Sequence, residues 1–103
     1  MSLLSILTVG GSKEAIAAFL YANINSNATT IVKSQKALLY QVTINKAGTN
    51  WLAYVIDGVA SGSSVATVDG TAVGGYGYNC LLDNGLTLIT SGSAAGDLTV
   101  VYL

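Results

Sequence analysis

Few side chains in this sequence could do chemistry, and they are widely spaced. The chain of 103 residues contains no histidine, which excludes histidine-based general-base catalysis, the Ser-His-Asp triad and most zinc sites. Glu14 is the only glutamate, and four aspartates stand next to glycine or asparagine: Asp57, Asp69, Asp83 and Asp97. They could cluster at one end of a β-sandwich and bind a hard cation, but turn chemistry alone explains them. We expect no catalytic residue, no metal site and no cofactor.

Residues 74–82 nearly match the calcium-binding nonapeptide G-G-x-G-x-D-x-U-x. The segment occurs once, and Asn79 stands where the ligand aspartate belongs. Because such sites form only when tandem repeats stack, we expect a strand in which Tyr76 and Tyr78 project on the same face. Cys80 is the single cysteine, so it cannot make an intramolecular disulfide, and we expect it to pack as a small core hydrophobe.

Aromatic side chains are the remaining candidates for a binding surface. The bulkiest groups of the expected central strands are Trp51, Tyr54, Tyr76 and Tyr78. Such rings pack in a core or an interface, or they form a platform on which sugars stack. Stacking on unpaired bases normally requires a basic groove, which four lysines, no arginine and a net charge of −1 do not provide. These residues predict core or interface packing, with a carbohydrate platform as the alternative, and no nucleic-acid partner.

The elements that must position these residues are strands. Proline is absent, and twelve glycines separate short segments rich in Val, Ile, Thr and Tyr. We expect strands at about residues 17–24, 28–33, 37–45, 50–57, 64–69, 75–82, 86–91 and 97–103. Turn signals that recur about every 8–14 residues are typical of such a fold. The predicted fold class is all-β, an antiparallel and jelly-roll-like β-sandwich of about eight short strands.

The whole chain is expected to form one domain. Residues 1–12 are predicted to be an N-terminal arm, and residues 13–103 a single β-sandwich domain. Residues 13–20 have an N-cap candidate, an acidic first turn and good helix formers, so a short helix is the alternative there. The longest apolar run has eight residues, far below the roughly 20 that cross a bilayer, so no membrane contact is expected. The start lacks the basic region of a signal peptide, which favours folding in a cytoplasm-like compartment.

Alternation within the strands predicts which residues share a face. Tyr40, Val42 and Ile44 are expected on one face of their strand. Residues 51–56 are apolar on both faces. That pattern suits a central strand covered on both sides, or a strand whose outer face meets another chain.

Short polar residues with glycine predict the connections. Turns are expected at residues 57–58, 69–70 and 83–85, because each combines aspartate with glycine. Longer loops of small residues are expected at 59–64 and 92–96. The aspartates are therefore expected in turns.

The low charge of the chain is its least ordinary feature. Charged residues are 9% of the sequence, where about 25% is typical. No lysine follows Lys46, so the second half lacks the lysines that normally protect the exposed edges of a sheet. A free monomer with unguarded edges and near-zero net charge should self-associate. We expect a homo-oligomer, either a dimer or a trimer.

The order of several segments resembles the small structural proteins of tailed-bacteriophage virions, the head decoration, cement or minor capsid proteins. The segments, within about residues 19–103, are 21–33, 38–48, 56–58, 65–69, 85–90 and 96–102. The resemblance implies a compact jelly-roll-like sandwich made in the host bacterial cytoplasm. It also implies an oligomer mounted on the capsid surface, which binds the major capsid protein and stabilises the shell by adhesion.

Two functions from different classes remain open. The first is a non-enzymatic decoration or cement protein of the virion. The alternative is a receptor- or glycan-binding module of a phage tail, fibre or head spike, which would use the aromatics near Trp51 and Tyr76. An enzyme is not expected, because histidine, arginine and any nucleophile constellation are missing.

Overall fold

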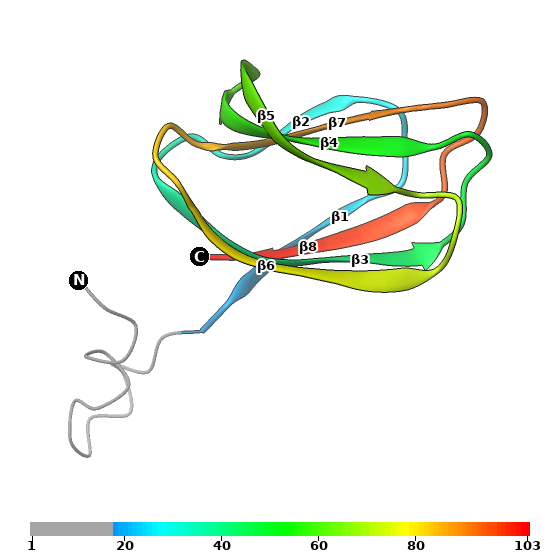
Figure 1. Ribbon diagram of the computed structural model, residues 1–103, viewed down its shortest axis with the longest axis horizontal. Coiled ribbons are helices and arrows are strands. Elements are labelled where there is room, and N and C mark those ends of the chain that lie inside the picture. Colours follow the sequence, from blue (N-terminus) through cyan, green and yellow to red (C-terminus); the bar gives the residue numbers. More distant parts are fainter. Residues whose placement is uncertain (1–17) are drawn as a thin grey trace.

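The computed structural model describes residues 18–103, which form two four-stranded antiparallel sheets packed as a sandwich (Figure 1). One sheet has the strand order β1-β8-β3-β6 and the other β2-β7-β4-β5. The predicted all-β sandwich of eight strands is confirmed. The strands are β1 (Leu20–Ile24), β2 (Thr29–Lys33), β3 (Ala37–Lys46), β4 (Leu52–Val59), β5 (Ser61–Asp69), β6 (Gly74–Leu82), β7 (Leu86–Ser91) and β8 (Asp97–Tyr102).

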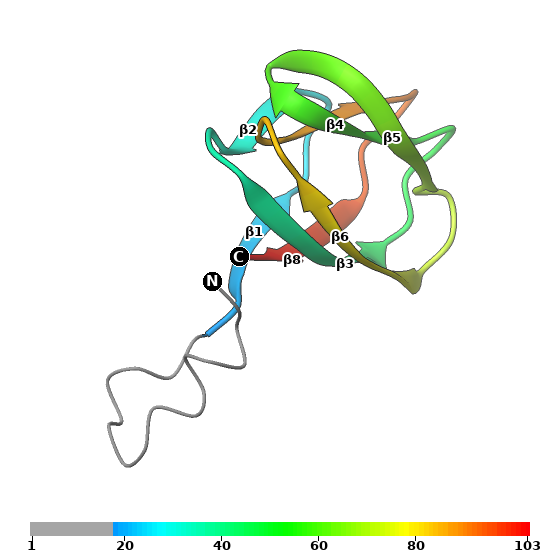
Figure 2. The ribbon, with the colours of Figure 1, turned by 60° about the vertical axis from the view of Figure 1, so that its left-hand side comes forward.

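The strands pair like a long hairpin that has been folded over on itself. β1 pairs with β8, β2 with β7, β3 with β6 and β4 with β5, and every pair is antiparallel. The β3–β8 and β4–β7 ladders join these pairs into the two sheets. Figure 2 shows the sheets as two layers with short connections passing between them at the ends. The edge strands are β1 and β6 in one sheet, and β2 and β5 in the other.

The core lies between the two sheets. Alternate residues of the central strands face inward and are almost fully buried, as the period of two in a strand requires. The main contributors are Leu39, Val42, Ile44, Leu98 and Val100 from one sheet, and Ala53, Val55, Leu86 and Leu88 from the other. In residues 51–56, Trp51, Ala53 and Val55 are fully buried. Leu52 and Tyr54, on the outer surface of β4, are half-buried, so the outer surface is not fully covered.

Tyr40 corrects one prediction. Val42 and Ile44 share a face as expected, and it points into the core, but Tyr40 does not share their face, because its side chain is 40% exposed. The register of β3 against β8 shifts between Leu39 and Gln41. Such a bulge adds one residue and reverses the alternation beyond it. The bulge therefore directs Tyr40 to the outer surface of the sheet.

The hairpin between β4 and β5 corrects two more predictions. Residues 57–58 are not a turn and residues 59–64 are not a loop, since β4 runs through Val59 and β5 begins at Ser61. The single intervening residue, Ala60, has φ 68°. The buried Thr87 on β7 holds the hairpin tip: its hydroxyl donates to the Gly58 carbonyl (2.8 Å) and accepts from the Ala60 amide (3.0 Å). Local composition suggests flexible loops here, but these tertiary hydrogen bonds extend both strands.

The loops at one end of the sandwich close over Trp51. Its side chain is fully buried, and its Nε1 donates to Asn27 Oδ1 at 2.8 Å. Glycines allow the loops to approach this closely. A Cβ on Gly70 would lie 2.5 Å from the Cε3 atom of the Trp51 ring, and one on Gly48 would lie 2.7 Å from its Cβ. The Trp51 side chain thus closes this end of the core.

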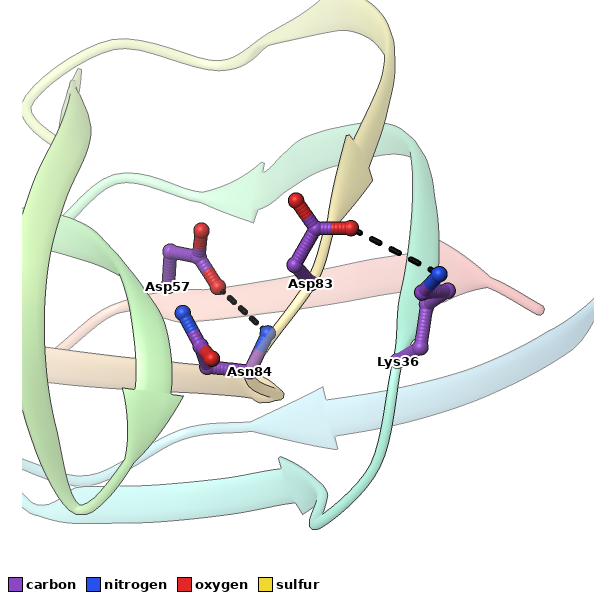
Figure 3. A network of polar contacts seen from close by, with 4 residues as sticks. All are labelled: Lys36, Asp57, Asp83 and Asn84. Atoms are coloured by element: carbon purple, nitrogen blue, oxygen red, sulfur yellow. Dashed lines mark hydrogen bonds and ion pairs between the residues drawn. The ribbon is translucent and has the colours of Figure 1, made fainter.

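Polar contacts hold the β6–β7 connection at the opposite end (Figure 3). The backbone amide of Asn84 donates to Asp57 Oδ1 at 2.9 Å, which ties the connection to β4. Lys36 Nζ lies 3.7 Å from Asp83 Oδ1. Both of these side chains are largely exposed, so water screens the ion pair and it adds little stability.

Some predictions lie outside the described residues. These are the N-terminal arm, residues 1–12, the start of the domain at residue 13, and most of the alternative helix over residues 13–20. Within the described part, the first strand begins at Leu20 rather than at residue 17.

Candidate functional site

The four aromatic residues selected from the sequence do not converge on one site. Trp51 is fully buried, so the core-packing alternative holds for it. Tyr54 is half-buried on the outer surface of the β2-β7-β4-β5 sheet, between the core residues Ala53 and Val55. Tyr76 and Tyr78 lie in β6 of the other sheet and are partly buried against the core. No common platform joins these four rings.

The four aspartates also separate. Asp57 and Asp83 lie at the end where β6 passes into β7, whereas Asp69 and Asp97 lie at the Trp51 end. Asp57 is inside β4 and Asp97 opens β8, so the prediction that all four stand in turns is wrong for these two. Within residues 18–103, no group of three or more His, Cys, Asp or Glu side chains is placed to hold a metal ion.

Hydrogen bonds account for the two perturbed carboxylates. The hydroxyl and backbone amide of Thr71 donate to Asp69 and lower its pKa. The side-chain amides of Asn45 and Asn23 donate to Asp97 Oδ1 at 3.0 and 2.6 Å and lower its pKa. A donor to the charged form favours ionisation. Both carboxylates therefore act as hydrogen-bond acceptors that fix strand ends, and neither is tuned for proton transfer near neutral pH.

Cys80 is half-buried and packs against the core, as predicted. Burial raises the pKa of its thiol, and the charge of Asp57 raises it further. Because the thiolate is the nucleophilic form, a raised pKa makes this cysteine less reactive than a free thiol.

The outer surface of the β1-β8-β3-β6 sheet carries a continuous patch of apolar side chains. The rings of Phe19 and Tyr40 lie with their centroids 4.7 Å apart. Reciprocal backbone hydrogen bonds of 2.9 Å pair Leu38 with Leu103 and extend the sheet at this end. We call this surface the apolar face; its residues are Phe19, Tyr21, Leu38, Tyr40, Leu81, Val101 and Leu103.

The apolar face is unusual because its large side chains are so accessible. Tyr21 is 76% exposed and Leu81 is 58% exposed. None of the seven residues of the face is charged. Contiguous exposed apolar surface of this kind marks interaction sites on proteins.

A hollow of about 340 Å³ adjoins the apolar face where β3 meets β6. The register between these strands shifts at the same bulge, so that Tyr40 lies opposite both Tyr78 and Asn79. Asn79 takes a left-handed conformation there, with φ 54°. The hollow is lined by Tyr40, Gln41, Gly77, Tyr78 and Asn79.

The lining of the hollow suits binding by hydrogen bonds and ring contacts. Tyr40 contributes a phenol, Gln41 and Asn79 contribute carboxamides, and no charged side chain of residues 18–103 lines the hollow. The Tyr78 side chain, like those of Tyr76 and Cys80, packs against the core rather than into the hollow. Burial raises the pKa of its hydroxyl, with smaller contributions from Tyr76 and Cys80.

Sequence reasoning found Tyr78 but missed Tyr40, Gln41 and Asn79. Simple alternation puts Tyr40 on the same face as Val42 and Ile44, because a bulge has no signal in the alternation of a single strand. The one usable signal was Asn79, since asparagine is among the few residues that tolerate a left-handed conformation inside a strand.

The described residues contain no helix long and apolar enough to cross a membrane. No protein-family model, curated protein or solved structure matches the chain.

Proposed function

We propose that this protein is a non-enzymatic structural protein of a tailed-bacteriophage virion. In this role it binds the capsid exterior as an oligomer and stabilises the shell as a decoration or cement protein. Its partners are other copies of the chain and the major capsid protein, and its place is the capsid surface after synthesis in the host bacterial cytoplasm. The resemblance of its segments to such proteins supplies the identity of the partner.

The strand pairing supports this assignment at the level of the fold. The first strand pairs with the last, the second with the seventh, and so inward, and this order supports a jelly-roll arrangement. Jelly rolls of eight strands are found in viral capsid and lectin domains. Because one fold hosts many functions, the pairing supports the class of protein and the surface must support the activity.

The apolar face is the observation that carries the proposal. An adhesive protein needs a surface whose removal from water lowers the free energy of the system. The exposed side chains of Tyr21 and Leu81 provide such a surface. Uncharged surroundings lower the desolvation cost of bringing that face against another protein. Repetition around a shell would add many such contacts, so that modest single interfaces yield strong attachment.

A capsid-binding experiment tests this function. Purified full-length protein is mixed with capsids that lack decoration, and bound protein is measured by co-sedimentation. We expect saturable binding that Leu81→Asp on β6 weakens about tenfold or more, because a charge on the apolar face disrupts the oligomer that attaches to the shell at several points.

The matched control is Val65→Asp on β5, the edge strand of the other sheet, where the native side chain is 48% exposed. It should bind like the native protein. Absence of binding by the native protein, or equal weakening by both variants, would contradict the proposal.

The hollow is a specific observation in favour of the second candidate, a receptor- or glycan-binding module of a tail, fibre or head spike. The phenol of Tyr40 and the carboxamides of Gln41 and Asn79 are groups that proteins use to hold uncharged ligands. A glycan array probed with the labelled native chain would separate this candidate from a pure cement protein.

A further inference from the structure

We infer that the hollow between β3 and β6 is a binding site for one ring of a neutral saccharide. The inference goes beyond capsid attachment, and it holds or fails separately from it. It rests on the shape of the hollow, on its hydrogen-bonding groups and on the absence of charge in its lining.

The shape of the hollow comes from the double bulge. One residue of β3, Tyr40, lies opposite two residues of β6, Tyr78 and Asn79, and all three line the hollow. Gly77 leaves the space open: a Cβ built on it has no atom within 4 Å. The volume of about 340 Å³ lies at the small end of the range of ligand sites, which suits a single sugar ring rather than a large cofactor.

The hydrogen-bonding groups are partly oriented before any ligand arrives. Gln41 Nε2 donates to Thr43 Oγ1 at 3.0 Å, which fixes this carboxamide and leaves its oxygen as an acceptor. Asn79 is exposed, and its side chain makes no hydrogen bond within residues 18–103. Carboxamides offer a donor and an acceptor side by side, a match for the neighbouring hydroxyls of a sugar.

The Tyr40 ring and the uncharged lining of the hollow indicate which class of ligand fits. Tyr40 presents aromatic surface that can contact the C–H groups of a sugar, whereas the Tyr78 side chain packs against the core. An ionic ligand would lack a counter-charge here, because no lysine, aspartate or glutamate of the described part of the chain, residues 18–103, lines the hollow. A purely apolar ligand would leave the two carboxamides without partners, at a cost. A neutral polyhydroxylated ring satisfies all of these groups.

Amide chemical-shift titration of the full-length, ¹⁵N-labelled protein tests the inference. The probes are methyl β-D-glucopyranoside, methyl β-D-galactopyranoside, methyl α-D-mannopyranoside and N-acetylglucosamine, with a blocked, uncharged alanine tripeptide as the competing class. We expect at least one sugar to give saturable shifts at Gly77 and Asn79, with a dissociation constant in the millimolar range typical of a small open site.

Two variants remove the site by different means. Gly77→Leu fills the hollow without a backbone clash, since the position has open space and no left-handed φ. Asn79→Gly removes the carboxamide and keeps a residue that accepts φ 54°. Each should weaken sugar binding about tenfold or more while leaving the remaining spectrum folded. Gly74→Leu is the matched control, because Gly74 also lies in β6 with open space beside it but does not line the hollow.

The outcomes divide cleanly. Saturable sugar shifts that both variants lose and the control keeps would support the site. The inference is wrong if none of the four sugars gives saturable shifts, if only the tripeptide does, or if Gly77→Leu binds sugar like the native protein. Capsid binding by the native chain is measured separately, so a failure here leaves the proposed function standing, and the reverse also holds.

Discussion

Asp97 illustrates how single polar residues organise this charge-poor protein. Its carboxylate accepts hydrogen bonds from Asn23 on β1 and Asn45 on β3, the two strands that flank β8. The charge is therefore used to fix three strands at one end of a sheet. Trp51 has the same kind of role at that end, where its indole N–H and three nearby loops close the core.

The lowered pKa of Asp97 predicts a loss of stability in acid. The hydrogen bond from Asn45, and then that from Asn23, stabilise the charged carboxylate in the folded chain. A group with a depressed folded pKa contributes fully above its unfolded value, near 3.8, and loses that contribution as the pH falls through the folded pKa. The native protein should thus lose more unfolding free energy than Asp97→Asn between pH 7 and strongly acidic pH.

Urea unfolding at a series of pH values measures this difference. Asn45→Ala, which keeps the carboxylate and removes the main donor, should reproduce part of the effect of Asp97→Asn. Parallel stability curves for the native chain and Asp97→Asn would show that these hydrogen bonds do not shift the titration.

At the scale of elements, the strands were predictable and their irregularities were not. Glycines and short polar residues punctuate β-rich segments, so all eight strands could be placed within a few residues. The dipeptides at 57–58 and 69–70 are both Asp-Gly, yet only the second ends a strand. The Gly58 amide donates to the Gly85 carbonyl at 3.2 Å, and no local pattern reveals such a distant partner.

The candidate site was harder to predict from the sequence than the fold, because it depends on contacts between distant strands. The hollow lies where the register of β3 shifts at Tyr40 against both β6 and β8. The sequence of a single strand does not show where its register against a distant strand will shift. Tyr78 could be selected from the sequence because an aromatic residue in a glycine-rich strand is a candidate binding group. Gln41 and Asn79 have ordinary residue types, and only the register brings them to the same hollow.

The β4–β5 hairpin gives a prediction with opposite signs at neighbouring positions. Ala60→Gly should raise the unfolding free energy by up to about 1 kcal/mol, because alanine at φ 68° is strained and glycine is not. Gly62→Ala should lower it by about 2 kcal/mol or more, since Gly62 has φ 153° and a Cβ there would lie 2.3 Å from the Asp57 carbonyl oxygen.

Chemical denaturation of the two variants beside the native chain provides the measurement. Equal effects of the two substitutions, or a stabilising Gly62→Ala, would mean that the hairpin does not have this tight backbone geometry.

At the scale of the whole molecule, the sandwich has a well-filled apolar core but also exposes apolar side chains on its outer surface. Its inner faces are filled by apolar side chains, and within residues 18–103 no buried side-chain nitrogen or oxygen lacks a hydrogen bond. Its outer surface exposes the apolar face, and charged residues make up only 9% of the chain. The core holds the fold together, and contact between the exposed apolar face and neighbouring molecules is expected to lower the free energy further.

Sedimentation equilibrium of the purified full-length chain tests this central claim most directly. We predict a dimer or trimer of the 10.5 kDa chain, converted towards monomer by Leu81→Asp or Tyr21→Asp and unchanged by the control Val65→Asp. A native protein that remains monomeric at the highest attainable concentration would contradict the account.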